Sequence, residues 1–383
     1  MNGDMTVTAP RGQAVWRAPR ARLLVNGAER AETGLEHFTL TRTRYSRADT
    51  LEMGLALDRT KIPASGPWFD LKGAAVAGTD IQLQMRDAAR PGAQWTTLFA
   101  GVMDHVELSP AETVVRIACR DYLARLLDMR VVDGWLNMTA AEVVTAMVTA
   151  AGLAPRVSMP GGMVGQFWQV GHLRMSAPGH SRFQTAFDLA CYLATTTGCD
   201  LYAEGKTITC APPATPDATN THVLDYTDTG PASPLSMGAS GLCLARDCQI
   251  ARGVVVHVMS WDSRQRTRID YYWSATGGST QRPAGGAELH GFTLPGARLD
   301  LLRQYAQARY NQIVAHERTI TGRIPGRLDL APRQFMRLSG TGTTWDGTLG
   351  VDAVSSHFSW EDGFSQQVTL RTRNVMEGDA NDD

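Results

Sequence analysis

The chain is short of lysine, of paired cysteines and of long apolar runs. Only Lys61, Lys72 and Lys206 are lysines among 37 basic residues, so arginine carries almost all of the positive charge. The basic residues nearly cancel 38 acidic ones, which leaves a formal net charge of −1 over 383 residues. A balanced charge creates no field that would attract nucleic acid or an anionic membrane. Bulk DNA binding is therefore not expected.

The cysteines and the apolar runs exclude further classes. The six cysteines contain no CxxC pair, so neither a disulfide framework nor a zinc site is indicated; they are Cys119, Cys191, Cys199, Cys210, Cys243 and Cys248. Several have apolar neighbours, and we expect reduced thiols that are mostly buried. No stretch approaches eighteen uncharged apolar residues, and residues 1–22 hold no apolar signal core. We therefore expect neither a membrane span nor secretory export.

What is present is the composition of an ordinary folded chain, 43% hydrophobic and 20% charged, with room for two or three domains. From about residue 20 to 121 the apolar period is two, which predicts strands. The alternation is clearest over residues 81–85, 98–108 and 115–119. Asn26-Gly27 favours a type I′ turn and predicts a hairpin there. A first small β-barrel is therefore predicted over residues 20–129.

The middle of the chain changes to a helical period. After a short helix over 121–127, Thr139 with Glu142 three residues later has the capping-box pattern, which predicts a helix over 140–151. A further amphipathic helix is expected over 181–197, and a hairpin around Glu204-Gly205. Residues 130–240 are therefore predicted to be an α+β domain.

The last third returns to strands. One helix is expected over 299–316, between strands at 253–261 and 267–273 and four closing strands. We assign residues 241–376 to a second β-barrel with a helix insertion, 1–19 to an extension and 377–383 to an acidic tail. The predicted fold class is α+β, mainly β: two small β-barrel domains with an inserted α+β domain.

Two blocks of the chain are similar to each other. Residues 98–121 and 349–374 each contain a strand with Gly and Asp, a turn, and a second strand that ends in Arg and Asp or Asn. Their spans from Gly to the closing residue are 20 and 24 residues, so the blocks differ chiefly in hairpin length. Either two amphipathic hairpins look alike by chance, or the chain holds two barrels of one kind. In the second case, three chains could form a six-part ring by pseudosymmetry.

The catalytic pattern that comes nearest to a match fails on one residue. Glu112 and Asp121 have the spacing of a phage-type lysozyme pair, but Leu127 stands where that pattern needs Thr. We place Glu112 in a hairpin turn and Asp121 at a helix start, where a negative charge is favourable.

Other short motifs are interpreted as turns, because each lacks a residue that its chemistry needs. They are Asp228-Thr229-Gly230, which Pro231 follows; Gly205-Lys206-Thr207, with Asp200 where a phosphate loop needs Gly; and Ser240-Gly241, without the residue that separates Ser from Gly in a nucleophile elbow. The nine histidines form no HExxH motif, and packing is expected to bury His357 fully or in half. Trp16, Trp68, Trp95 and Trp168 could mark a carbohydrate-binding face, but core or interface positions are preferred. The sequence thus predicts no enzyme and no catalytic, cofactor-binding or metal-binding residues.

The order of the elements resembles the baseplate hub proteins of tailed phages, the late control or tail hub proteins related to the base of type VI secretion spikes. The resemblance covers about residues 20–375, with no counterpart before Arg20. His357 and Gly363 occupy the places of a His and a Gly turn in the family's closing barrel. It rests on Leu98 to Asp121, AAEVVTAMVTAAGL, DLACYLATTTGCDLYAEGKTITCAPP, GRLDLAPRQFMRLSGTG and GTLGVDAVSSHFSWEDGFSQQVTLRTRN.

The resemblance implies a structural protein that forms a homotrimeric, pseudo-sixfold ring and joins the tail tube to the central spike. Its implied partners are the spike protein, tail tube or distal tail proteins, baseplate wedge proteins and the tape measure protein, with DNA only in transit. Its implied location is the virion tail baseplate, after assembly in the host cytoplasm. The near-neutral charge suits a channel that must not hold DNA tightly. The alternatives are a tail-associated peptidoglycan hydrolase and a carbohydrate-binding tail-tip protein.

Overall fold

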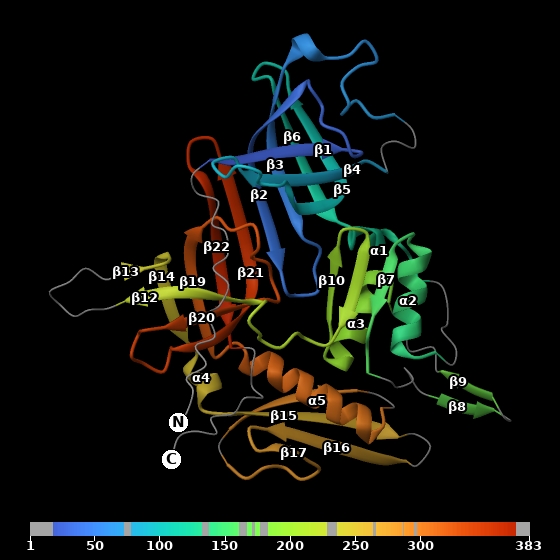
Figure 1. The fold of residues 1–383 in the computed structure, drawn as a ribbon. Coiled ribbons are helices and arrows are strands. Elements are labelled where there is room, and N and C mark those ends of the chain that lie inside the picture. The colour runs from blue at the N-terminus through green and yellow to red at the C-terminus, as the bar shows by residue number, and fades with distance from the viewer. Residues whose placement is uncertain are drawn as a thin grey trace.

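The chain is mainly β and is dominated by one 13-stranded sheet (Figure 1). The computed structural model describes residues 18–72, 78–131, 138–160, 167–170, 173–176, 183–227, 236–262, 266–285, 287–294 and 297–372. The predictions for residues 1–17, 228–230 and 377–383 lie outside these residues.

Six N-terminal strands form one end of the large sheet in the order β1-β4-β5-β6-β3-β2, and all neighbours are antiparallel. They are β1 (Pro19–Val25), β2 (Thr33–Thr43), β3 (Thr50–Leu57), β4 (Asp80–Asp87), β5 (Thr96–Ser109) and β6 (Val114–Asp121), with a 3-10 helix at Arg59–Lys61. Every second residue of β4 is buried, because alternate side chains of a strand point to one face. The alternation that predicted this strand is confirmed.

The hairpin predicted at Asn26-Gly27 forms only as a turn. These two residues have φ values of 50° and 80°, and Val25 and Ala28 exchange backbone hydrogen bonds of 2.8 and 3.2 Å around them. The chain does not fold back along β1, since the pair Val25↔Ala28 is an isolated bridge and the described strand that pairs with β1 is β4. The next strand, β2, pairs with β3 and β21 instead. The turn is confirmed, and the hairpin prediction is wrong.

Six C-terminal strands repeat this arrangement. They lie in the order β12-β20-β21-β22-β19-β14, so their order along the chain and in the sheet matches β1 to β6 one for one. They are β12 (Thr221–Thr227), β14 (Ser240–Arg246), β19 (Arg318–Pro325), β20 (Phe335–Ser339), β21 (Gly347–Ser359) and β22 (Gly363–Arg371). One sense differs, because β12 runs parallel to β20 while β1 is antiparallel to β4. We call β1 to β6 the first repeat and these six strands the second repeat; β13 (Ser236–Met237) extends the latter beyond β12.

One irregular position is shared by the two repeats. The β5–β6 register shifts at Asp104, and the β21–β22 register shifts at Asp352. The other shifts differ, because the β2–β3 and β14–β19 shifts are not at equivalent places and the β4–β5 shift has no counterpart in the β20–β21 pair. Bulges occupy defined places in a fold. The shared place of Asp104 and Asp352 favours a true repeat over a chance likeness of two hairpins.

The described strands form no closed barrel, so the prediction of two separate barrels is not confirmed. Instead β2 pairs antiparallel with β21, from His37↔Ser359 to Thr43↔Ala353, and joins the repeats into one sheet. The physical reason is a difference in strand length. β21 has 13 residues and β20 has five, so β20 leaves half of one edge of β21 open for β2.

A helical unit follows the first repeat and packs beside it (Figure 1). It contains α1 (Ala124–Asp128), α2 (Ala140–Ala150), α3 (Ala186–Thr197), and a sheet of β7 (Ala154–Val157), β10 (Asp200–Glu204) and β11 (Thr207–Ala211). A separate pair is formed by β8 (Phe167–Val170) and β9 (Leu173–Ser176).

The helix boundaries follow from their caps. The predicted capping box of α2 is confirmed, because the Thr139 hydroxyl accepts the Glu142 N–H at 3.2 Å and the Glu142 carboxylate accepts the Thr139 N–H at 2.7 Å. The predicted α3 starts later than residue 181, because Thr185 caps it by accepting the Asp188 N–H. It ends at Gly198 with φ 70°, as expected.

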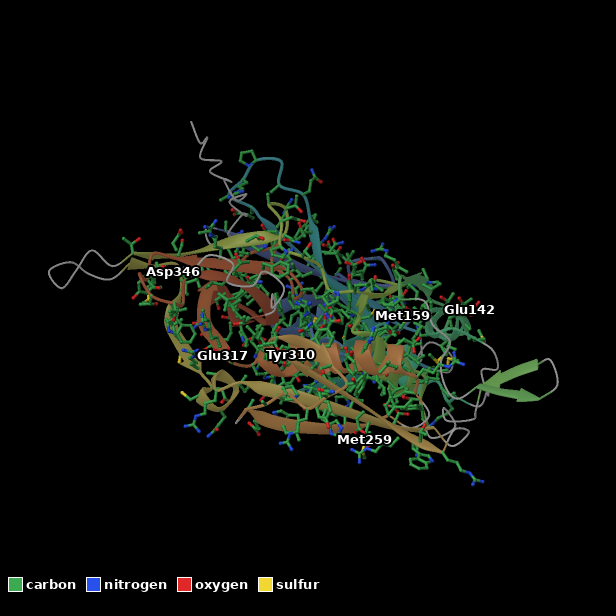
Figure 2. The ribbon with its side chains drawn as sticks, turned by 90° about the horizontal axis from the view of Figure 1, so that it is seen from below. Glu142, Met159, Met259, Tyr310, Glu317 and Asp346 are labelled. Atoms are coloured by element: carbon green, nitrogen blue, oxygen red, sulfur yellow. The ribbon has the colours of Figure 1, made fainter. Side chains whose placement is uncertain are left out.

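A four-stranded sheet with one covering helix lies between β14 and β19 in the chain. Its strands are β15 (Val254–Asp262), β16 (Thr267–Ser274), β17 (Gly277–Ser279) and β18 (Glu288–Thr293), with α4 (Cys248–Ala251) before them and α5 (Leu299–Val314) after them. Figure 2 shows Met259 of β15 and Tyr310 of α5 in this unit. None of the helices in the described part of the chain has the length and apolar character that a membrane crossing requires.

Candidate functional site

A cluster of charged side chains lies where the two repeats meet the helical unit. The cluster is drawn from the ends of β2 and β6, from β10, and from the second repeat. We call it the junction cluster, and its members are Arg42, Arg44, Asp49, Asp121, Asp200, Arg333, Asp352 and Arg371. Burying charges is costly unless they are paired, so each contact in the cluster constrains how these parts fit together.

Two arginines hold the end of β2 against the second repeat. Arg42 Nη2 donates to the Leu330 carbonyl at 2.7 Å, and Arg333 Nη2 donates to the Thr43 carbonyl at 3.1 Å. The Arg333 guanidinium also lies 3.9 Å from the ring centroid of Tyr202, in the helical unit. Burial lowers the pKa of both arginines, and the charge of Asp49 partly opposes this. Arg333 therefore contacts all three parts of the chain.

Two carboxylates organise the adjoining turns. Asp49 accepts the Thr43 N–H at 3.1 Å, and Asp121 accepts the N–H groups of Asp49 and Leu123 at 3.0 and 2.9 Å. Asp121 is only 5% exposed. Burial, followed by the charge of Asp49, raises the pKa of Asp121 to about 7. Burial also raises the pKa of Asp49. The predicted helix start at Asp121 is wrong by three residues, because this carboxylate holds a turn before α1.

A second group of contacts joins the same three parts. Arg44 Nη2 lies 3.1 Å from Asp200 Oδ2 in β10, and the Arg44 side chain is 5% exposed. Asp352 is fully buried, accepts the Tyr45 hydroxyl at 3.0 Å, and lies 3.6 Å from Arg371 Nε. Arg371 in turn contacts the Tyr45 hydroxyl and the His316 ring beyond α5. The junction cluster is thus an arrangement for holding units together.

The fold places the two residues of the lysozyme-like pair, Glu112 and Asp121, far apart. Glu112 is exposed in the β5–β6 turn, where it pairs with Arg116 at 3.2 Å, while Asp121 is buried at the opposite end of β6. A strand rises about 3.3 Å per residue, so the two carboxyls are roughly 25 Å apart. Glycosidase carboxyls act across about 5 to 10 Å. This pair cannot serve one reaction.

Two of the motifs interpreted as turns fall in described residues. Gly205-Lys206-Thr207 makes the tight turn between β10 and β11, with φ 56° at Gly205, as expected. Lys206 Nζ forms an ion pair with Asp80 of β4, which also accepts the Tyr122 hydroxyl at 2.8 Å. This lysine therefore adds a contact between the helical unit and the first repeat. Ser240 begins β14 and donates to a backbone carbonyl at 3.3 Å.

The prediction that His357 is buried or half-buried is wrong. Its neighbours Ser356 and Phe358 fill the inward positions of β21, so the period of two turns His357 outward. Its ring hydrogen-bonds to Thr39 at 3.2 Å and Ser355 at 3.1 Å on that exposed face.

Trp68 and Trp95, two of the four tryptophans named from the sequence, contact other protein groups. The guanidinium groups of Arg22 and Arg86 lie 4.3 and 4.6 Å from the ring centroid of Trp95. Trp68 is half-buried, donates to Thr33 Oγ1 at 3.1 Å and packs edge-on against Phe69. Arginines therefore lie over the ring of Trp95, and Trp68 is partly withdrawn into the protein, which favours packing for both residues. Trp168 lies in β8, and Trp16 lies outside the described residues.

The cysteines largely match expectation, and all six are free. Burial is full for Cys119, Cys199 and Cys210 and partial for Cys191, whereas Cys243 and Cys248 are exposed. Within the described ranges, no three His, Cys, Asp or Glu residues gather in a way that could hold a metal ion.

No protein-family model matches the sequence, and no curated protein matches it. Solved tail proteins do share the fold. The tail protein from Neisseria meningitidis superposes with a TM-score of 0.62 at 11% identity, over 94% of this chain and 98% of that one. The 43 kDa tail protein of prophage MuSo2 from Shewanella oneidensis gives 0.62 and 11%, over 94% and 99%.

A type VI secretion component has a related structure. The E. coli c3393 protein, described as structurally similar to the T4 bacteriophage tail proteins gp27 and gp5, gives a TM-score of 0.51 at 10% identity, over 91% of this chain and 76% of that one. The chain therefore has the fold of phage tail proteins and of a type VI secretion component. The resemblance found in the sequence is confirmed at the level of the fold.

Proposed function

We propose that the protein is a structural component of a phage tail baseplate hub. The observation that carries this proposal is the pair of equivalent six-stranded repeats, joined edge to edge through β2 and β21. One chain then supplies two similar parts of a ring, and three chains supply six. Such a homotrimer would match a sixfold tail tube on one side and a threefold spike on the other.

The junction cluster supports this function because it fixes the angle between the repeats. A ring closes only if every step turns by the same amount, so its subunits must be rigid. Arg44 and Arg333 each bridge separate parts of the chain from positions that are largely withdrawn from solvent. A displaced β2 would leave these charges unpaired, which costs several kcal/mol.

In the proposed ring, the central channel passes the tape measure protein and then DNA. The remaining partners are the central spike, tail tube or distal tail proteins, and baseplate wedge proteins. We place the protein in the virion tail baseplate, assembled in the host cytoplasm, with no catalytic role. The chain divisions near residues 129 and 240 stay a prediction.

Sedimentation equilibrium of the purified full chain at micromolar concentration tests the proposal. We expect a particle of three times the 41.6 kDa chain mass. A monomer at every concentration would contradict the ring. A peptidoglycan zymogram with the same preparation separates the proposal from the hydrolase alternative, because a cleared zone would show an activity that a structural protein does not have.

A further inference from the structure

The contact between β2 and β21 joins an edge of the first repeat to an edge of the second. The counterpart of each of these edges, in the opposite repeat, has no partner strand among the described residues. In the second repeat the counterpart of β2 is β14, and among the described strands it pairs with β19 alone. In the first repeat the counterpart of β21 is β5. Within the part of the chain that the structure describes, each repeat therefore has one edge paired inside the chain and one without a partner strand.

The open edge of β5 has the same origin as the occupied edge of β21. β4 pairs with β5 only from Thr96 to Val102, and β5 continues to Ser109. The edge of His105–Ser109 that faces the β4 side has no strand beside it among the described residues. In β21 the stretch after the bulge at Asp352 is where β2 binds.

The equivalence also fixes a register. Leu40 of β2 and Leu244 of β14 are counterparts, because Leu40 lies opposite Leu51 and Leu244 opposite Ile320 at matching places in β3 and β19. Counting from the bulges at Asp104 and Asp352, Leu108 of β5 is the counterpart of Ser356 of β21.

Inside the chain, Leu40 pairs with Ser356. We therefore infer that β14 of one copy pairs antiparallel with His105–Ser109 of a second copy, with Leu244 opposite Leu108. This inference rests on the proposed ring and names the edges that would close it.

The side chains of the two edges suit this pairing. Leu108 is 42% exposed and Leu244 is half-buried, whereas Leu40, already in a joined edge, is fully buried. On the opposite face the register brings Ala245 against Glu107 and Cys243 against Ser109. This face is polar or small, as is the corresponding face of the β2–β21 contact. One face of the extended sheet would then remain apolar across the contact, and the other would remain polar or lined by small residues.

The open edges lack two of the devices that block strand pairing. Natural proteins protect exposed edges with lysine and proline, among other means. Residues 240–246 and 105–109 contain neither of these two residues. The end of β14 is also fixed within the single chain, because Arg246 pairs with Arg318 of β19 and its Nη2 donates to Glu317 at 2.7 Å.

A contact of this kind is heterologous, since each copy offers β14 to one neighbour and β5 to the other. Heterologous contacts generate either closed rings or open filaments. In the inferred assembly, contacts within and between chains have the same geometry and alternate around the ring. Three copies then give six equivalent steps.

An engineered disulfide tests the register. In the variant Ser109→Cys, the new thiol would lie opposite Cys243 of the neighbouring copy, where facing Cβ atoms are about 4.5 to 5.5 Å apart and can adjust to a disulfide. After mild oxidation we expect disulfide-linked dimers and trimers, and nothing larger, on a non-reducing gel. The double variant Ser109→Cys, Cys243→Ser keeps the exposed Cys248 and should stay uncrosslinked.

The outcomes separate the two proposals. If the variant sediments as a trimer but oxidation leaves single chains, the inferred edge pairing is wrong and the ring stands. Crosslinks that persist in the double variant would also overturn the pairing. If the unmodified protein is a monomer in sedimentation, the ring itself fails, and the pairing fails with it.

Discussion

Asp104 and Arg120 form a bidentate ion pair across the β5–β6 hairpin, with Arg120 Nε and Nη2 2.5 and 2.8 Å from the two carboxylate oxygens. Asp352 and Arg371 hold the same places in the second repeat, because each aspartate sits at the bulge and each arginine follows the residue that pairs just before the bulge. The pair is therefore a repeated feature of the fold. Its surroundings differ, since the first pair is about one-third exposed and Asp352 is fully buried.

This difference predicts unequal effects on stability. Asp104→Ala removes a partly exposed pair and should lower the free energy of unfolding by about 1 kcal/mol or less. Asp352→Ala leaves Arg371 without its buried carboxylate and removes the acceptor of the Tyr45 hydroxyl, so we expect a loss of about 3 kcal/mol or more. Urea titrations of both variants measure the difference. Equal losses would contradict the assigned burial.

The raised pKa of Asp121 should make the stability of the folded protein depend on pH. Its pKa is raised from 3.8 to about 7 in the folded protein, so the folded state binds the proton more tightly than the unfolded chain does. The contribution of this group to stability is full below its unfolded pKa and is lost as pH rises through 7. Between pH 5 and 8 the wild type should therefore lose stability relative to Asp121→Asn. Melting temperatures of both proteins across that range test this, and parallel curves would show that Asp121 does not titrate there.

The close approach of two strands at Gly101 in β5 leaves no space for a side chain there. A Cβ atom on this residue would lie 2.1 Å from the backbone oxygen of Arg120, whereas one on Gly34 of β2 would meet nothing within 4 Å. Gly101→Ala should therefore force the hairpin apart and cost about 1 to 3 kcal/mol. Gly34→Ala is the matched control and should change stability by less than about 0.5 kcal/mol. Similar unfolding midpoints for the two variants would refute the close approach.

Leu108 predicts a specific effect on assembly. It is 42% exposed in the single chain, so Leu108→Glu should leave the fold intact but place a charge in the inferred contact with Leu244. We expect the dissociation constant of the oligomer to rise at least tenfold. Leu289→Glu on β18, where the leucine is 41% exposed, should leave it unchanged. Sedimentation velocity over a dilution series compares the two, and an equal effect of both substitutions would count against the β5 edge.

Local patterns predicted the elements well because their causes are local. The Thr139 and Glu142 side chains lie three residues apart and cap α2 within one turn. Likewise, the alternation in β4 needs only neighbouring residues. The burial of His357 was predicted wrongly. Which residues of β21 face the core is set by packing across the whole sheet, and neighbouring residues in the sequence do not reveal it. A burial pattern counted from the bulge at Asp352 would have placed it outside.

The junction cluster could not be predicted, because its contacts connect distant parts of the chain. Arg333 donates to the Thr43 carbonyl across 290 positions, and Arg44 reaches Asp200 across 156. No spacing in the sequence marks such partners. The repeat was the one long-range signal present, and it led to the equivalence of the strands. It did not show that β2 would bind β21 and leave both repeats open.

Electron microscopy of the purified full chain tests most directly whether two repeats per chain build a six-part ring. Class averages should show a ring with a central opening and six peripheral densities that alternate in two kinds, so that threefold symmetry holds and sixfold symmetry is only approximate. Particles of a single chain, or open filaments of indefinite length, would contradict the ring.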